Sequence, residues 1–212
     1  MFITFEGIEG AGKSLQISRS AAYLEGKGVR CLVTREPGGT QFGRAVRQVL
    51  LDTGGARREP MSELLLYLAD RYQHLHEVVQ PALARGLTVL SDRYHDATLA
   101  YQGIARGLSL EMIDRLAQLL QIPEPGGTVL LDLDPRIGLV RARTRNEQDG
   151  AASAEGRFEA EELDFHHAVR EAYLHVARRS PGRIRIVPAE GSPDDVFLRI
   201  APLLDQWVLH ER

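Results

Sequence analysis

The chain has 212 residues, a formal net charge of −3, 43% hydrophobic and 26% charged residues. This balance excludes an intrinsically disordered chain, which needs fewer apolar residues and a larger net charge. Without a basic excess, and with 6% aromatic residues, the chain is also unlike most nucleic-acid binders. No apolar run approaches the roughly 20 residues that span a bilayer, and Cys31 has no second cysteine to pair with. We therefore expect a protein of the reducing cytoplasm, with neither a nucleic-acid nor a membrane partner.

The predicted elements alternate between strands and helices along one domain, residues 1–212. Short apolar runs predict strands at 2–6, 29–34, 88–91, 128–134 and 184–187. Helical periodicity predicts helices at 13–27, 40–51, 62–85, 136–143 and 159–179, the third of them bent near Pro81. Residues 52–60 predict a loop, and 144–157, rich in Gly, Ala, Ser and charge, a mobile surface segment. The alternation predicts an α/β fold, a five-stranded parallel sheet flanked by helices on both faces.

A phosphate-binding loop follows the first predicted strand. The segment Gly7-Ile8-Glu9-Gly10-Ala11-Gly12-Lys13-Ser14 matches G-x-x-x-x-G-K-[ST] between a strand and a helix, the context this motif requires. Backbone N–H groups and the helix N-terminus favour a polyphosphate there, Lys13 can span its β and γ phosphates, and Ser14 can hold Mg²⁺. All eight residues are therefore predicted to bind ATP. The alternative is a glycine-rich turn without a ligand.

The lysine count decides against one class of phosphate-binding proteins. GTPases use Asn-Lys-x-Asp to bind guanine, and with lysines only at 13 and 27 the chain has no such tetrapeptide.

Asp92 and Arg93 end the third predicted strand, at the rim where open parallel sheets bind ligands. Arg93 can clamp an acceptor phosphate, and Asp92 can hold Mg²⁺ through water or orient Arg93. The alternative is a strand-end salt bridge without a ligand.

Two side chains of the third predicted helix share one face. Tyr67 and Arg71 are four residues apart, so a ring that stacks and a guanidinium that donates can meet one flat ligand. The alternative is an amphipathic helix that packs Tyr67 into the core. Four histidines show no zinc-like spacing and are assigned structural or surface roles, and Cys31 is expected to be a small core residue. These histidines are His74, His76, His166 and His167.

Five motifs in this order and spacing resemble the thymidylate kinase family of the bacterial type, across essentially the whole chain. They are FITFEGIEGAGKS at the start, Arg35-Glu36-Pro37-Gly38-Gly39-Thr40, Leu65-Leu66-Tyr67-Leu68-Ala69-Asp70-Arg71, Asp92-Arg93-Tyr94 and Tyr101-Gln102-Gly103. The resemblance implies a P-loop NTPase fold with a mobile lid and a homodimer packed through helices on one side of the sheet. It implies that ATP, with Mg²⁺, phosphorylates dTMP to dTDP on the way to dTTP.

The resemblance also implies roles for individual residues. Arg93 and Arg47 are expected at the 5′-phosphate of dTMP, with Tyr67 stacked on thymine and Arg71 donating to its carbonyl oxygen. The remaining expected contacts are Thr98 and Gln102 to the base, Tyr101 against a 2′-hydroxyl, and Glu36 and Pro37 to the sugar. Glu9 is expected near the acceptor sugar, its metal or the reacting oxygens. The family commonly has Phe where this chain has Tyr67, which keeps the stacking face.

The segment at about 143–157 resembles the lid of these kinases. Bacterial members commonly place a catalytic arginine there when the phosphate-binding loop lacks one, and this loop has Gly10 at the corresponding position. Arg143, Arg145 and Arg157 are therefore candidates to join Lys13, Arg93, Glu9 and Asp92 in catalysis, and Arg141 is a candidate ATP contact. For any one lid arginine the alternative is a solvated charge. Two further functions stay open: a kinase for another nucleoside monophosphate such as dUMP, or a regulatory ATPase that transfers no phosphate.

Overall fold

The computed structural model describes residues 1–52, 58–148 and 161–209, and its centre is a parallel sheet. The sheet has five strands in the order β2-β3-β1-β4-β5. They are β1 (Phe2–Glu6), β2 (Cys31–Arg35), β3 (Thr88–Asp92), β4 (Gly127–Asp132) and β5 (Ile184–Pro188). All four neighbouring pairs are parallel, so every strand ends at the same edge. The predicted five-stranded parallel sheet is confirmed.

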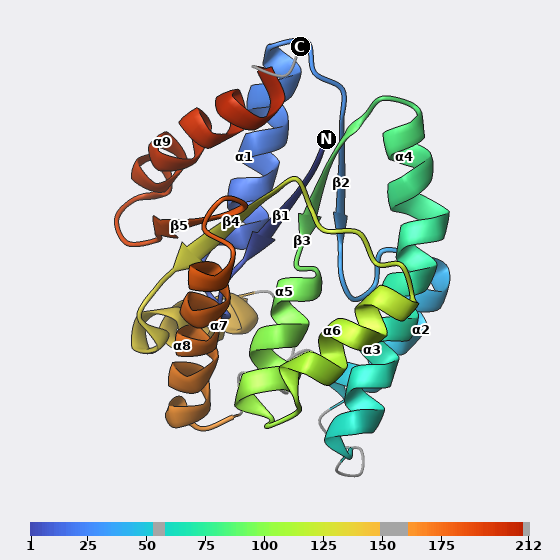
Figure 1. Ribbon diagram of the computed structural model, residues 1–212. Helices are drawn as coiled ribbons and strands as arrows, with labels where there is room; N and C mark the ends of the chain where they lie inside the picture. The colour runs from blue at the N-terminus through green and yellow to red at the C-terminus, as the bar shows by residue number, and fades with distance from the viewer. Residues whose placement is uncertain (53–57, 149–160, 210–212) are drawn as a thin grey trace.

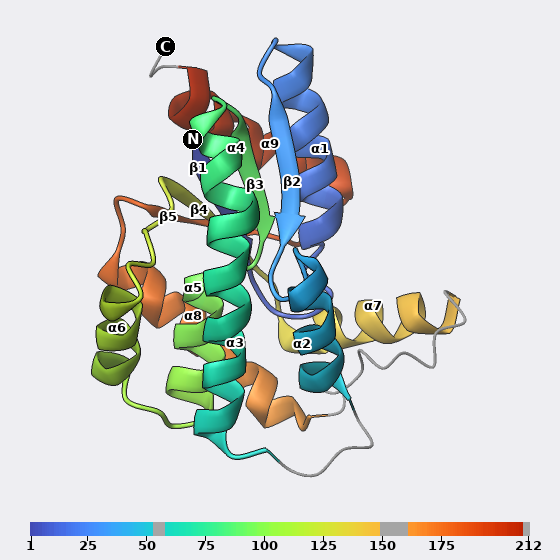
Figure 2. The ribbon, with the colours of Figure 1, turned by 90° about the vertical axis from the view of Figure 1, so that its right-hand side faces the viewer.

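Helices cover both faces of this sheet (Figures 1 and 2). One face carries α1 (Lys13–Gly26) and α9 (Pro193–Leu204), and the other carries α3, α4, α5, α6 and α8. Their bounds are α3 Pro60–His74, α4 Gln80–Ala84, α5 His95–Thr98, α6 Leu110–Leu119 and α8 Leu163–Arg179. Beyond the carboxyl ends of the strands lie α2 (Gln41–Leu51) and α7 (Pro135–Gln148). Three π-helical turns complete the elements: η1 (Leu75–Val79), η2 (Leu99–Ala105) and η3 (Asp205–Leu209).

The central strand β1 is buried along its whole length. Its neighbours β3 and β4 pair with it so that Phe5 lies opposite both Asp92 and Val129. Strands covered on both faces need apolar residues on both, which is why the sequence of β1 reads as a nearly continuous hydrophobic run. This buried strand fixes where its carboxyl end, and therefore the phosphate-binding loop, sits.

Several predicted boundaries differ from the structure. The helix predicted at 159–179 begins at Leu163, and the strands predicted at 29–34 and 128–134 are Cys31–Arg35 and Gly127–Asp132. The helix expected over 62–85, with a bend near Pro81, consists of α3, η1 and α4, because Pro81 has no N–H to donate and its ring crowds the carbonyl four residues earlier. A wider π turn just before the proline accommodates this. The segment expected to be mobile from residue 144 begins as helix, since α7 continues to Gln148. Over the described ranges, no helix is long and apolar enough to cross a membrane.

Candidate active site

The phosphate-binding loop connects β1 to α1 as predicted. Three of its glycines have positive φ, and at Gly10 a side chain could not fit because its Cβ would lie 2.0 Å from the carbonyl oxygen of Gly138 in α7. The ammonium of Lys13 folds over the loop and donates to the carbonyls of Gly7 at 3.0 Å and Ile8 at 2.9 Å. Burial, and then the neighbouring Arg93, lower the pKa of Lys13 to about 8. Phosphates bound at the loop would raise the pKa of Lys13 again and keep its ammonium charged, so Lys13 is suited to bind an anion.

Ser14 and Asp92 meet at the first turn of α1. The Ser14 hydroxyl donates to Asp92 Oδ2 at 2.9 Å, which joins the phosphate-binding loop to the end of β3. A hydroxyl and a carboxylate are hard oxygen ligands, the kind Mg²⁺ takes when phosphates and waters supply the rest of its shell. The donor set therefore fits the predicted magnesium position.

Arg93 bridges β3 and the phosphate-binding loop. It takes a left-handed backbone conformation with φ 69°, unusual for a residue with a side chain. Its Nη1 donates to the Gly7 carbonyl and to the Tyr173 hydroxyl, each at 3.0 Å, and its Nη2 donates to Glu9 Oε1 at 2.7 Å. These bonds use three of the five guanidinium N–H donors. These bonds come from the two Nη nitrogens, so among the described residues Nε makes no hydrogen bond and its N–H suits a phosphate.

Glu9 lies at the centre of the charged cluster above the sheet. It accepts from Arg93 and from the Tyr101 hydroxyl, whose single hydrogen lies between the two Glu9 oxygens at O–O distances of 2.7 and 2.9 Å, and His166 Nδ1 is 3.6 Å away. Burial alone would raise the pKa of Glu9, but Arg93, then His166, Lys13 and Tyr101, hold it well below its usual range. The carboxylate therefore stays ionised, and Arg93 offsets its repulsion of nearby phosphates.

Arg71 is the hub of a second, fully buried cluster. Its Nε donates to Glu36 Oε2 at 2.7 Å, its Nη1 to the Thr98 hydroxyl at 2.9 Å and its Nη2 to the Tyr94 carbonyl at 2.9 Å. His74 joins the other oxygen of Glu36 at 2.7 Å, so the predicted structural role of this histidine holds. The structure thus brings together Glu36, Arg71 and Thr98, which sequence reasoning had placed in one ligand site. All three nitrogens of the Arg71 guanidinium are hydrogen-bonded within the protein.

The other predicted acceptor contacts border these clusters. Gln102 is buried and donates to Glu63 at 2.8 Å, and Arg47 donates to the Pro37 carbonyl at 3.0 Å. Tyr67 is half-buried on α3, so it is neither a core residue nor fully exposed. Their contacts to a substrate remain predictions.

The lid arginines are only partly placed. Arg141 and Arg143 are exposed on α7, and Arg141 donates to the Ala189 carbonyl at 3.3 Å. The side chain of Arg145 and the whole of Arg157 lie outside the described residues, as does most of the predicted lid. The choice among the lid arginines therefore stays a prediction.

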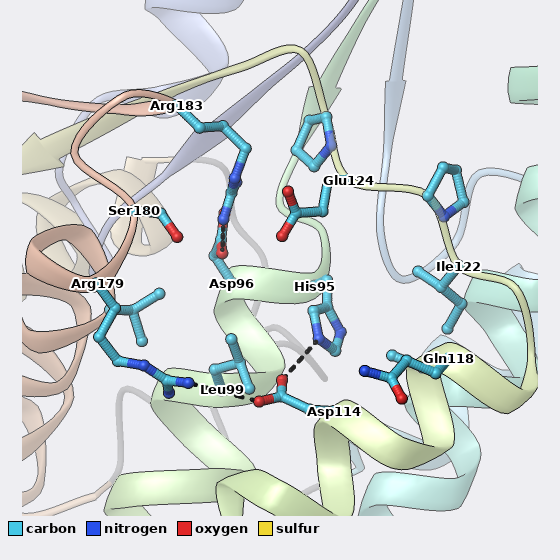
Figure 3. Close-up of a pocket in the computed structure, with 14 residues that line it drawn as sticks. His95, Asp96, Leu99, Asp114, Gln118, Ile122, Glu124, Arg179, Ser180 and Arg183 are labelled. Atoms are coloured by element: carbon cyan, nitrogen blue, oxygen red, sulfur yellow. Dashed lines mark hydrogen bonds and ion pairs between the residues drawn. The ribbon is translucent and has the colours of Figure 1, made fainter.

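A separate cavity of about 300 Å³ lies between α5, α6 and the end of α8 (Figure 3). Its wall includes the Arg183–Asp96 ion pair, and none of the residues predicted to contact ATP or dTMP lines it. This cavity is distinct from the candidate active site.

Sequence reasoning missed three side chains at the site, two that touch predicted catalytic residues and one that holds the first of these two. Tyr173 contacts Arg93, Glu6 contacts Tyr173, and His166 lies beside Glu9. Tyr173 and His166 occupy the buried face of α8, and Glu6 ends the buried strand β1. Apolar periodicity marks such positions as core. The one available signal was the glutamate itself, a charged residue in a strand otherwise free of charge.

Comparison with known proteins agrees with this geometry. The model of one family, Thymidylate kinase, matches residues 5–200. The chain belongs to the thymidylate kinase family. The thymidylate kinase of Oleidesulfovibrio alaskensis is 50% identical over 201 residues, 94% of this chain and 95% of that protein. That of Syntrophotalea carbinolica is 52% identical over 200 residues, 94% and 92% of the two chains. The crystal structure of the Ehrlichia chaffeensis thymidylate kinase has a TM-score of 0.77 at 31% identity, covering 96% of this chain and 98% of that one.

Family membership settles the class of reaction. The chain is an ATP-dependent nucleoside monophosphate kinase, a transferase of nucleotide biosynthesis, and the predicted P-loop NTPase fold is confirmed. The relatives support dTMP as the acceptor and give no support to a dUMP kinase or a regulatory ATPase.

Proposed function

We propose that the residues around Arg93 carry the transfer of the γ-phosphoryl group of ATP to the 5′-phosphate of dTMP, within one kinase domain of residues 1–212. The observation that carries this proposal is the position of Arg93 between the two halves of the site. Its Nη1 donates to the phosphate-binding loop at the Gly7 carbonyl, and its Nε, which makes no hydrogen bond to a described residue, can donate to a second phosphate. ATP and the acceptor phosphate are both anions, so a cation that contacts both lowers the repulsion between them.

On the donor side, the loop Gly7 to Ser14 holds the ATP phosphates with its N–H groups and Lys13. Mg²⁺ fits at the Ser14 hydroxyl, with Asp92 as a ligand through water, and when bound it neutralises charge on the transferring group. Asp92 orients the Ser14 hydroxyl by accepting its hydrogen. Arg141, exposed on α7, is the further ATP contact of this proposal.

On the acceptor side, Arg93 and Arg47 hold the 5′-phosphate, and Tyr67 stacks on thymine. The cluster of Glu36, Arg71 and Thr98 forms the floor for the sugar and base, together with Pro37 and Gln102. Tyr101, held by Glu9 at 2.7 Å, limits the space at the 2′ position. Because Glu9 positions both Arg93 and Tyr101, its role is to organise the acceptor phosphate and sugar sides together.

Transfer itself asks for charge neutralisation and alignment. Lys13, Arg93 and one lid arginine, Arg143, Arg145 or Arg157, surround the transferring group, and a lid over about 143–157 excludes water from it.

The proposal includes a cytoplasmic homodimer. Exposed apolar side chains on α2 and α3 support the second copy: Phe42, Val49, Met61, Leu65 and Tyr72. These two helices lie next to each other on one side of the molecule (Figure 2).

The test offers ATP with Mg²⁺ and, in turn, dTMP, dUMP, dGMP and AMP to the purified protein and measures both products. We expect ADP and dTDP in equal amounts with dTMP, and turnover with dUMP lower by about 10 to 100-fold, since one methyl group in a pocket is worth about 1–3 kcal/mol. ATP hydrolysis that dTMP does not stimulate would contradict the proposal.

Arg93→Ala tests the residue that carries the proposal. We expect the dissociation constant of dTMP to rise by about 100-fold, since a bidentate charge-assisted contact is lost, while ATP still binds. Arg178→Ala, which removes an arginine from the exposed end of α8, is the matched control and should bind both nucleotides as the wild type does. Unchanged dTMP binding in Arg93→Ala would overturn the assignment.

A further inference from the structure

Glu6 is an acidic residue buried at the end of β1, and although it lies in the first motif of the sequence, no role was predicted for it. Its side chain is fully buried, and both carboxylate oxygens accept hydrogen bonds. Oε1 accepts from the backbone N–H of Tyr94 at 2.7 Å, and Oε2 accepts from the Tyr173 hydroxyl at 2.8 Å. Each of these two contacts leads to Arg93, one through its backbone and one through its side chain.

The backbone contact acts on the peptide that follows Arg93. Arg93 itself donates its N–H to the Phe5 carbonyl at 3.0 Å, and the next N–H, that of Tyr94, goes to Glu6. Two consecutive N–H groups are therefore bound to the last two residues of β1. Because Arg93 has φ 69°, which costs free energy for a non-glycine residue, external bonds on both sides are what hold the chain in that turn.

The side-chain contact acts on the guanidinium. The Tyr173 hydroxyl donates to Glu6 and accepts from Arg93 Nη1 at 3.0 Å, so it transmits the orientation of the carboxylate to the cation. With the Gly7 carbonyl as the other Nη1 partner, both hydrogens of that nitrogen are fixed. These two contacts therefore fix the orientation of the guanidinium, including the direction of its Nε–H.

We infer that Glu6 and Tyr173 are positioning residues that aim the guanidinium of Arg93 at the acceptor phosphate. This inference rests on the proposed role of Arg93 in binding that phosphate. Neither residue touches a substrate: the carboxylate is enclosed, and Tyr173 is 3% exposed.

The surrounding charges favour this role over a general structural one. The nearest other buried carboxylate, Asp96, has its own cation, because Arg183 donates to both of its oxygens at 2.7 and 2.8 Å. That pair lines the cavity of Figure 3, and Arg93 is the cation that lowers the pKa of Glu6 most. Burial, then Asp96, outweigh this and raise the pKa of Glu6 to about 8, so Glu6 is mostly ionised only above about pH 8. Its hydrogen bonds, from the Tyr94 N–H and the Tyr173 hydroxyl, both lead to Arg93, which ties the role of Glu6 to Arg93.

The test is a double-mutant cycle on Arg93 and Tyr173, measured as dTMP binding by calorimetry without turnover. Tyr173→Phe removes only the hydroxyl, and we expect the dissociation constant of dTMP to rise about tenfold while that of ATP stays within about twofold. In the Arg93→Ala background the same change should have almost no further effect, because its target is gone. Glu6→Gln keeps an acceptor for Tyr94 but presents N–H groups to Tyr173, and above about pH 8, where the wild-type carboxylate is ionised, it should weaken dTMP binding as Tyr173→Phe does.

Tyr23→Phe is the matched control. The Tyr23 hydroxyl also joins a carboxylate and a cation, since it donates to Asp205 at 2.9 Å and accepts from Lys27 at 2.6 Å, but Tyr23 belongs to α1, which covers the other face of the sheet (Figure 2). We expect it to leave dTMP binding unchanged, and thermal unfolding of every variant checks that each is folded. Wild-type dTMP binding by Tyr173→Phe, or additive effects with Arg93→Ala, would overturn the inference. Normal binding by Arg93→Ala alone would instead overturn the proposed function.

Discussion

At the scale of residues, this protein stabilises buried charge by sharing partners. The Glu36 carboxylate contacts both Arg71 Nε and His74 Nδ1, each at 2.7 Å, so one carboxylate fixes two side chains of α3. Burial lowers the pKa of Arg71, but Glu36 and its neighbours outweigh this and raise it, so the guanidinium stays charged. Removing one partner of such a group leaves an uncompensated charge, which costs more than the bond itself. The acceptor floor is therefore rigid before any substrate binds.

Asp70 is the exception, because its charge is poorly compensated. Oδ1 accepts from the Gly38 N–H at 3.1 Å, while Oδ2 is buried with no partner among the described residues. Burial, then Glu36, raise its pKa from 3.8 to about 6. The folded state thus binds the proton more tightly than the unfolded state, and the stability this gives is present below about pH 4 and is lost as the pH rises through about 6.

Asp70→Asn should therefore stabilise the protein at pH 7.5 by about 1–2 kcal/mol, with the gain vanishing near pH 4. Asparagine keeps an oxygen for Gly38. Urea unfolding at both pH values measures the difference, and the exposed substitution Glu171→Gln on α8 is the control, expected to change little at either pH. A gain that is the same at both pH values would show that the charge of Asp70 is not its cause.

At the scale of elements, single residues determine where helices are interrupted and where they begin. The π turn η1 interrupts a segment whose apolar pattern indicates one long helix, because a proline acts on the hydrogen bonds of the preceding turn. The start of α9 is set locally. The Ser192 hydroxyl accepts from the Asp195 N–H at 3.2 Å, and Asp195 accepts in return from the Ser192 N–H at 2.9 Å, a complete capping box.

Ser192→Ala should lower the free energy of unfolding by about 1 kcal/mol, because the Asp195 N–H in the first turn of α9 loses its acceptor. The loss is expected to be global, since α9 packs on α1, with the rings of Phe197 and Tyr23 5.5 Å apart. Ser18→Ala, an exposed serine inside α1, is the control and should change stability by a few tenths of a kcal/mol. Equal losses in the two variants, measured by urea unfolding, would exclude the cap as the cause.

At the scale of the whole molecule, the order of strands builds the site. With β1 between β3 and β4, the phosphate-binding loop after β1 is beside Asp92 and Arg93 after β3. The acceptor floor is then supplied by the helices on one face, α3 and the segment α5–η2. The apolar side chains left exposed on α2 and α3 lie outside this site, so a partner can cover them without blocking it.

Leu65, 53% exposed on α3, tests the proposed homodimer. Leu65→Glu places a charge in the expected interface and should yield monomers, with the dimer dissociation constant raised by at least about 100-fold. Light scattering over a concentration series measures this. Leu198→Glu, at a position 70% exposed on α9, is the matched control and should remain dimeric. A wild-type monomer at high concentration would refute the dimer, and a dimeric Leu65→Glu would place the interface elsewhere.

The sequence by itself determined the features that are local along the chain. The glycines, Lys13 and Ser14 are consecutive, and Arg93 directly follows a strand, so spacing alone assigned the phosphate-binding loop and the rim of the sheet. Five strands followed from five short apolar runs for the same reason. Only the tertiary structure decided which distant side chains hold these groups in place. Arg93 meets Tyr173 80 positions later, and Arg71 meets Glu36 35 positions earlier. Such contacts depend on strand order and helix packing. Apolar periodicity predicts only that these positions are buried, and not which residues they contact.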